Sequence, residues 1–330
     1  MNDARADTSR PFWAVRAERG TAGALRLMLR LLGFFGRRAS ALLIHPIAAY
    51  FWLTDARARA ASERYLARLV STEAGRAALG HVPGRRDTYR HIYEFAVSIF
   101  DRLCVWADLG DVEISHRGAD HFAHLPDAAP GEGGNSLGKR GAIIVGAHLG
   151  SFDMMRAASM SQAVRVHVAM YLENARTVNG FFEGLNPELE LDLIPVRPGA
   201  TGASLEIRAA VERGDFVAIM GDRAGLFGNA EYHAPFLGAD AGFAGGPFEI
   251  AATIGCPVVM ATTLRVGEGR YEVRSWPLYA GGRVARRDRK ASVQAMIEDY
   301  ARILEAATCE APYQWFNFFD FWGAGAPDRS

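Results

Sequence analysis

Short apolar runs alternate with amphipathic stretches along the chain from residue 142 onward. The apolar runs have the length of buried strands, and the stretches between them place apolar residues at helical spacing. Such alternation predicts an α/β fold with a mixed, mostly parallel central sheet that is covered by helices on both faces. The predicted strands are residues 142–147, 164–171, 191–196, 216–220, 257–264 and 271–276, and the predicted helices are residues 152–160, 176–185, 202–213, 245–254 and 291–307.

The first third of the chain has a helical pattern instead. Apolar residues recur at helical periods from residue 56 to residue 108, and residues 111–116 resemble a short strand. Residues 127–141 are rich in glycine and are predicted to form a loop. We therefore expect two parts, membrane-associated helices over residues 1–55 and an α/β domain over residues 56–330.

The most hydrophobic region is residues 24–54. Its uncharged part, residues 39–54, has 16 residues and contains Pro46, so it is shorter than the roughly 20 residues that a spanning helix needs. An apolar stripe at helical spacing precedes it, with Arg26 and Arg30 off the stripe, and consists of Leu25, Met28, Leu29, Leu32 and Phe35. These features favour a pair of amphipathic helices in a membrane interface. A helical hairpin in the core and a short membrane span are the alternatives.

The charge is distributed unevenly although the formal net charge is zero. Residues 1–60 hold ten arginines and four acids, which leaves this region about +6. A neutral chain argues against a nucleic-acid binder that works through bulk charge, whereas a basic and apolar front favours an anionic membrane surface. The three cysteines, Cys104, Cys256 and Cys309, have no metal-binding spacing and are typical of a reducing compartment.

Two predicted strands end in polar residues. His148 follows the strand over residues 142–147, and Asp222 and Arg223 follow the strand over residues 216–220. In open α/β sheets, ligands bind outside the carboxyl ends of the strands. We therefore expect these side chains to reach the same edge of the sheet, which is the edge where a ligand would bind.

The turn after His148 carries further candidate residues. Gly150 permits a tight bend, Ser151 is expected to cap the next helix, and Asp153 falls in its first turn. If the turn folds Asp153 back onto the imidazole, the carboxylate fixes the tautomer and makes His148 a general base. The alternative is an acidic residue at a helix start and a buried, hydrogen-bonded histidine.

The segment from His148 to Asp153 matches the H-X4-D motif of glycerolipid acyltransferases. Its setting resembles the bacterial lipid A biosynthesis (lysophospholipid-like) acyltransferase family. The hydrophobic basic N-terminus, "MGDRAG" followed by "PFLG", "AGGPFEIAATIGCPVV", and the closing "YQWFNFFDFW" agree with that family or with a predicted branch of its superfamily. The likeness covers about residues 20–322 and implies a glycerolipid-acyltransferase-like fold.

The resemblance implies transfer of an acyl group from an acyl-carrier-protein or coenzyme A thioester to a hydroxyl or amine of a lipid or glycolipid acceptor. His148 would deprotonate the acceptor, oriented by Asp153, without a metal or a cofactor other than the thioester. Substrate-binding residues would include Asp222, Arg223, Gly150 and Ser151, and more weakly Asn174 and Arg176. The same likeness implies a location at the cytoplasmic face of the inner membrane, and the zero net charge leads us to expect no nucleic-acid partner.

Other interpretations compete with catalysis by His148. A lipid-binding or membrane-scaffold protein could keep the fold without catalysis, with His148 and Asp153 pointing into separate regions. Ser136 lies in a G-X-S-X-G pattern, but a loop precedes it where a hydrolase elbow needs a strand. A zinc site is disfavoured because no catalytic partner accompanies the cluster of His116, Asp120, His121 and His124.

Two further segments have distinctive side chains. Arginines and a lysine before the last predicted helix are either a solvated turn or a docking surface for an acidic carrier or anionic lipids; they are Arg283, Arg286, Arg287, Arg289 and Lys290. The aromatic residues 315–322 are expected to pack beneath the N-terminal helices or to lie at a membrane interface.

Overall fold

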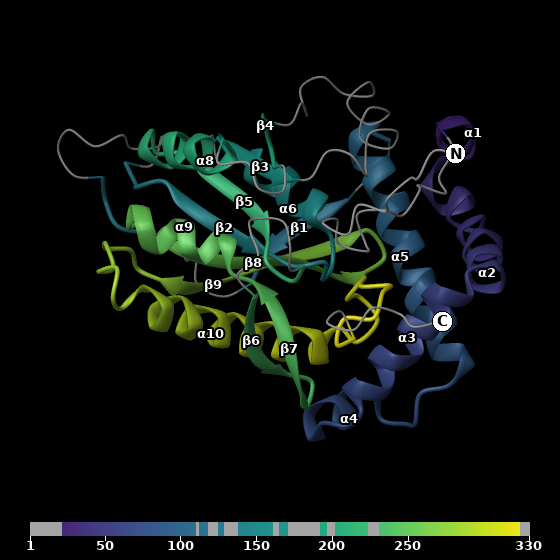
Figure 1. Ribbon diagram of the computed structural model, residues 1–330. Coiled ribbons are helices and arrows are strands. Elements are labelled where there is room, and N and C mark those ends of the chain that lie inside the picture. The colour runs from purple at the N-terminus through teal and green to yellow at the C-terminus, as the bar shows by residue number, and fades with distance from the viewer. Residues whose placement is uncertain are drawn as a thin grey trace, which may run out of the picture.

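A computed structural model describes most of the chain. The described residues are 22–109, 112–117, 125–128, 138–160, 165–170, 192–196, 202–223 and 231–323. They form an α/β fold in which a twisted sheet has helices on both faces, and a group of N-terminal helices lies beside one end of it (Figure 1).

The central sheet has seven strands in the order β1-β9-β8-β2-β5-β3-β4. Its pairings are parallel except for the antiparallel contact between β8 and β9, so the sheet is mixed and mostly parallel, as predicted. The strands are β1 (Glu113–His116), β2 (Ala142–Gly146), β3 (Val166–Met170), β4 (Asp192–Pro195), β5 (Phe216–Met220), β8 (Val258–Gly267) and β9 (Arg270–Tyr279). All seven lie within two or three residues of the predicted runs.

The sequence pattern missed a second, two-stranded sheet. Strands β6 (Glu231–Phe236) and β7 (Ala239–Ala244) form an antiparallel hairpin that packs against α10. Alternate residues of this hairpin are buried in the main core, among them Ala234, Phe236 and Phe243. Phe236, part of the "PFLG" segment, is therefore a core residue with no exposed surface.

Successive residues of a strand point to opposite faces of the sheet, and two separate cores result. Ile143 and Val145 of β2 face the main core, which is covered by α8, α9 and α10. Ile144 faces a smaller core that includes Met155 of α6. The helices are α6 (Phe152–Met160), α8 (Gly202–Glu212), α9 (Gly246–Ile254) and α10 (Arg289–Glu310), close to the predicted ranges.

In the described part of the chain, five helices precede the sheet and gather beside it (Figure 1). They are α1 (Ala22–Ala41), α2 (Ile44–Thr54), α3 (Ala56–Leu69), α4 (Glu73–Leu79) and α5 (Arg85–Trp106). The long α5 contacts α1, α2, α3 and α6, so it joins the N-terminal helices to the sheet domain. The helical pattern predicted over residues 56–108 is confirmed.

The first two helices bury one side and expose the other. Met28, Leu29 and Leu32 of the predicted apolar stripe pack against α5 in a separate cluster, whereas Phe35 is exposed. The stripe therefore serves protein packing more than was expected. Within the described residues, every helix is too short or too polar to span a membrane.

Candidate functional site

Register places His148 and Asp222 side by side. Strands β2 and β5 are parallel neighbours, and Gly146 pairs with Met220 at their carboxyl ends. His148 and Asp222 each follow two residues after these paired positions. Since both chains leave the sheet at the same level, the imidazole and the carboxylate meet at the edge.

Two hydrogen bonds join His148 to the Asp222 carboxylate. His148 Nδ1 lies 2.8 Å from Asp222 Oδ1, and the His148 backbone N–H donates to Asp222 Oδ2 at 2.9 Å. The Asp222 side chain has no exposed surface, whereas a quarter of the His148 side chain is exposed. A buried carboxylate therefore holds a histidine that stays accessible.

The charges of the pair decide which nitrogen carries the proton. Burial alone would raise the pKa of Asp222, but His148 and Arg223 lower it to about 2. An ionised carboxylate can only accept, so Nδ1 must donate, and in the neutral ring Nε2 keeps a lone pair. Burial and the nearby Arg223 lower the pKa of His148, while Asp222 opposes them. The imidazole is consequently neutral near pH 7 and able to take a proton at Nε2.

The turn after His148 has the geometry that the sequence predicts. Gly150 has a φ of 72°, and a Cβ there would meet the Thr263 carbonyl oxygen at 2.0 Å. Only glycine fits this close approach between the turn and β8. The Ser151 hydroxyl accepts from the Met154 N–H at 3.4 Å and so caps α6.

Asp153 does not take the role expected of it. Its carboxylate lies 3.1 Å from Arg102 Nε of α5, whereas Asp222 occupies the position beside the imidazole. Asp153 sits in the first turn of α6, and this helix packs against α5 as well as the sheet. The identification of Asp153 as the carboxylate that orients His148 is therefore corrected to Asp222.

Arg223 lies beside the His148–Asp222 pair. Its Nε donates to Asn317 Oδ1 at 3.1 Å, and its guanidinium lies 5.3 Å from the centre of the Phe319 ring. Arg223, expected to be a substrate-binding residue, thus also contacts Asn317. The guanidinium remains close enough to lower the pKa of His148.

Sequence analysis missed two residues of the site, Trp315 and Asn317. Trp315 Nε1 donates to Asp222 Oδ2 at 3.1 Å, and Asn317 Nδ2 donates to the same oxygen at 3.0 Å. They come from the aromatic segment after α10, which was expected to pack beneath the helices of residues 1–55 or to lie at a membrane interface. Trp315 packs against Tyr65 of α3, beyond residue 55. The same segment contacts the site, a pairing between distant parts of the chain that the local pattern does not reveal.

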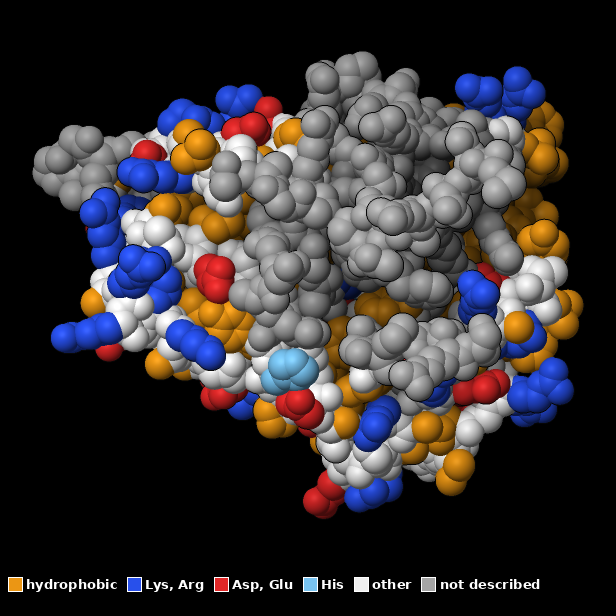
Figure 2. All heavy atoms as spheres, in the orientation of Figure 1, with side chains coloured by type: hydrophobic (Ala, Val, Ile, Leu, Met, Phe, Trp, Pro, Cys, Tyr) orange, Lys and Arg blue, Asp and Glu red, His pale blue; other side chains and the backbone are white. Residues whose placement is uncertain are grey.

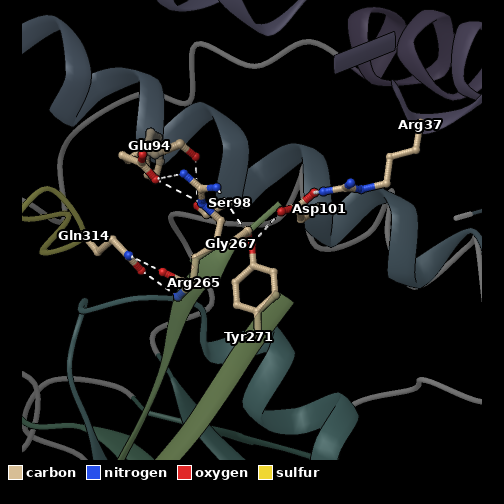
Figure 3. Close-up of polar contacts among 9 residues, drawn as sticks. Arg37, Glu94, Ser98, Asp101, Arg265, Gly267, Tyr271 and Gln314 are labelled. Carbon is tan, nitrogen blue, oxygen red and sulfur yellow. Dashed lines mark hydrogen bonds and ion pairs between the residues drawn. The ribbon is translucent and has the colours of Figure 1, made fainter. Parts of the chain in front are cut away.

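A second buried polar cluster lies between α1, α5 and β9 (Figure 3). Asp101 accepts from Arg37 at 2.8 Å and from the Tyr271 hydroxyl at 2.7 Å. Nearby, Glu94 pairs with Arg265, whose backbone exchanges two hydrogen bonds with the side chain of Gln314. Each charged group in this cluster has an opposite partner, so the arrangement is structural.

Most of the other candidate site residues named from the sequence lie outside the described residues. Asn174, Arg176, Ser136 and the cluster of Asp120, His121 and His124 lie outside the described residues. His116 is exposed on the edge strand β1. In the described part of the chain, no group of three or more histidine, cysteine, aspartate or glutamate side chains could hold a metal ion.

The basic segment before α10 lies far from His148. Backbone hydrogen bonds join Gly282 to Gly255 and Val284 to Ala252, near the start of β8. Because β8 and β2 are parallel, this is the amino end of β2, opposite the edge that carries His148 (Figure 1).

In comparisons with the sequence profiles of known families and with curated proteins, nothing matches this chain.

Proposed function

We propose that this protein is an acyltransferase that moves a fatty acyl group from an acyl-carrier-protein or coenzyme A thioester to a hydroxyl or amine of a lipid or glycolipid acceptor. The observation that carries the proposal is the His148–Asp222 pair, in which a buried carboxylate holds the Nδ1–H of a partly exposed imidazole. The resemblance of the segment from His148 to Asp153 to the H-X4-D motif supplies the reaction class.

The proposed step uses His148 as a general base. Nε2 takes the proton of the acceptor hydroxyl while that oxygen attacks the thioester carbonyl carbon. The imidazolium that forms is stabilised by Asp222. When the tetrahedral intermediate collapses, the carbon–sulfur bond breaks, the ester forms, and the imidazolium returns its proton to the leaving thiolate.

The oxyanion of the intermediate needs a donor, and the amides of Gly150 and Ser151, just before α6, are poor candidates. The Gly150 N–H already donates to the Gln314 carbonyl and the Ser151 N–H to the Thr263 carbonyl, both at 2.8 Å. A cation beside the base can serve instead. We assign that role to Arg223, whose charge already acts on His148.

The alternative is a lipid-binding scaffold without catalysis. Separation of His148 from Asp153 is the arrangement expected of such a protein, and the Arg102–Asp153 pair fits it. However, Asp222 supplies the orienting carboxylate that Asp153 does not, and a purely structural histidine has no need of an accessible ring. The dyad therefore favours catalysis.

The N-terminal helices support a place on an anionic membrane surface, at the cytoplasmic face of the inner membrane. Phe34 is 82 % exposed, Leu42 70 % and Leu53 65 %. Arg26 and Arg30 are exposed near them, and α1 and α2 contain no acidic residue. Figure 2 shows hydrophobic side chains along the right-hand edge, over α1 and α2, with basic side chains above them. An apolar face with a basic border is typical of interfacial helices.

Vesicle binding tests this location. The triple substitution Phe34→Ser, Leu42→Ser and Leu53→Ser should abolish co-flotation with phosphatidylglycerol vesicles, because it removes apolar side chains from the face. A triple control changes exposed residues elsewhere, namely Val82, Leu205 and Val266 to Ser, and should bind like the parent. Equal binding by both triple variants contradicts membrane contact through α1 and α2.

Replacement of His148 tests the function itself. His148→Ala should lower thioester-dependent acylation of a lysophospholipid or lipid A precursor mixture about 10²–10⁴-fold, the usual contribution of a general base. His233→Ala is the matched control, since His233 also bonds a carboxylate through Nδ1 but is half exposed on β6. Undiminished turnover in His148→Ala refutes the proposal.

A further inference from the structure

Residues 314–317, here called the C-terminal strap, lie along the turn that carries His148. Leu149 and Trp315 form an antiparallel bridge. The Gly150 N–H donates to the Gln314 carbonyl at 2.8 Å, and the Phe316 N–H donates to the His148 carbonyl at 2.6 Å. The strap therefore holds the backbone on both sides of the bridge, so its side chains are fixed relative to the imidazole.

Two strap side chains donate hydrogen bonds to the same oxygen of the Asp222 carboxylate. Oδ2 accepts from Trp315 Nε1, from Asn317 Nδ2 and from the His148 backbone, at 2.9–3.1 Å. Oδ1 is left to face His148 Nδ1 at 2.8 Å. Three donors on one oxygen fix the rotation of the carboxylate, and that rotation aims the other oxygen at the imidazole.

Asn317 has two partners of opposite chemistry. Its Nδ2 donates to the carboxylate of Asp222, and its Oδ1 accepts from Nε of Arg223. Asn317 is only 1 % exposed, so neither contact is replaced easily by water. An amide alone among small side chains offers a donor and an acceptor from one planar group.

Trp315 is held just as firmly. Its side chain has no exposed surface and contacts the rings of Tyr65, Phe236 and Phe321, with centroids 4.9–5.1 Å away. The backbone carbonyl of Trp315 also accepts from His91 of α5 at 2.9 Å. Rigid packing on three sides turns the indole N–H into a fixed donor for Asp222.

We propose that Asn317, assisted by Trp315, is the positioning residue of this site: it fixes the Asp222 carboxylate so that His148 keeps its proton on Nδ1, and it holds Arg223 next to the pair. This inference rests on the proposed function for its kinetic consequence, but its structural consequence is independent of activity. The strap thus belongs to the reaction site and not only to the core.

The test is the tautomer of His148, read from imidazole ¹⁵N chemical shifts and assigned by the signals lost in His148→Ala. Asn317→Leu removes both contacts, and Asn317→Asp keeps an acceptor for Arg223 but loses the donor to Asp222. Both should reduce the population of the Nδ1–H form.

In both variants we expect kcat to fall about tenfold, a part of the 10²–10⁴-fold general-base effect, with KM little changed. Gln294→Leu, which removes an amide from α10 that bonds the His233 carbonyl and Glu298, should change neither quantity.

Trp315→Phe keeps the ring and loses only the indole N–H, so it tests the same idea if the Asn317 variants unfold. It should shift the tautomer in the same direction and to a smaller extent. A His148 ring that stays in the Nδ1–H form in every folded strap variant, with unchanged kcat, overturns the inference. Failure of the proposed function has a different signature, namely a parent protein that transfers no acyl group while the strap variants still alter the tautomer.

Discussion

Two buried carboxylates, Asp222 and Asp101, have no exposed side-chain surface, yet they lie in environments of different chemistry. Asp101 lies between Arg37 and the hydroxyl of Tyr271 (Figure 3). Asp222 lies among three neutral N–H donors and the imidazole of His148. The first carboxylate is paired with a permanent cation, whereas the second also faces an imidazole, whose charge depends on pH.

This difference separates a structural network from a reactive one. Burial and Asp101 raise the pKa of Tyr271, so its hydroxyl neither gains nor loses a proton under ordinary conditions. Asp101 likewise raises the pKa of Arg37 against the effect of burial. At the other site the lowered pKa of His148 leaves a basic nitrogen that is partly exposed. Burial of charge alone is therefore a poor guide to function, and the presence of an accessible proton acceptor is a better one.

The strongest test of this comparison is Asp222→Asn. We expect acyl transfer to fall about 10²–10⁴-fold, because an amide at this position no longer holds Nδ1–H and the base is lost to the wrong tautomer. Asp240→Asn is the matched control, since Asp240 also lies on a histidine Nδ1 at 2.7 Å but is 70 % exposed. Steady-state kinetics should leave the control within twofold, and similar losses in both variants would contradict a special role for Asp222.

Asp101→Asn should have the opposite profile, with loss of stability and retained chemistry. Removing one partner of a buried ion pair costs about 3–5 kcal/mol, and we expect the lower end because Arg37 keeps a contact with Glu268 at 3.4 Å. Urea unfolding measures the change, with Glu212→Gln in the exposed Arg208–Glu212 pair as control. A large fall in kcat with unchanged free energy of unfolding would place Asp101 in the reactive network instead.

His91 lies on α5, as Asp101 does, and contacts the strap; it should make stability depend on pH. It accepts from Ser62 and donates to the Trp315 carbonyl, both at 2.9 Å, without any exposed surface. Burial lowers its pKa to about 4, against the bond to Trp315. Between about pH 6.5 and pH 4 the unfolded chain binds a proton that the folded chain does not, so stability falls as the pH falls through this window by up to about 3 kcal/mol.

The measurement is the free energy of unfolding at a series of pH values for the parent and for His91→Gln. Glutamine keeps a donor and an acceptor but does not titrate, so its curve should be flatter across the window. Parallel curves would show that His91 is not the source of the dependence.

Much of the site could be predicted from local sequence. The apolar runs before His148 and Asp222 are buried strands, and Gly150 and Ser151 have the conformations that the turn requires. The partner of His148 was assigned wrongly because Asp153 is near in sequence. Because Gly146 and Met220 pair directly in two parallel strands, Asp222 and not Asp153 lies beside the imidazole.

The parts that escaped prediction depend on contacts between distant segments. Nothing local to Trp315 or Asn317 indicates a bond to a carboxylate more than ninety residues away. The β6–β7 hairpin was missed although Tyr232, Ala234 and Phe236 alternate with more polar residues, because a proline interrupts the run at residue 235. Asp222 was expected at the same edge as His148, and counting positions from the ends of the two strands would have paired the two residues. The strap could be placed only by tertiary packing.

The smallest expected effect is a shift in the pKa of His148, which separates charge from geometry at the reactive site. It is measured apart from the loss of rate that Arg223→Gln should also cause through the oxyanion. Arg223 lowers the pKa of His148, while Asp222 raises it. Arg223→Gln should therefore raise the pKa of the imidazole and move the acid limb of the kcat/KM profile to higher pH, whereas Asp222→Asn should move the pKa lower. Imidazole NMR titration measures both shifts without turnover, and Arg208→Gln on the exposed face of α8 is the control. Shifts of equal sign in the two variants would mean that loosening of the site, and not the charge of each neighbour, governs the basicity of His148.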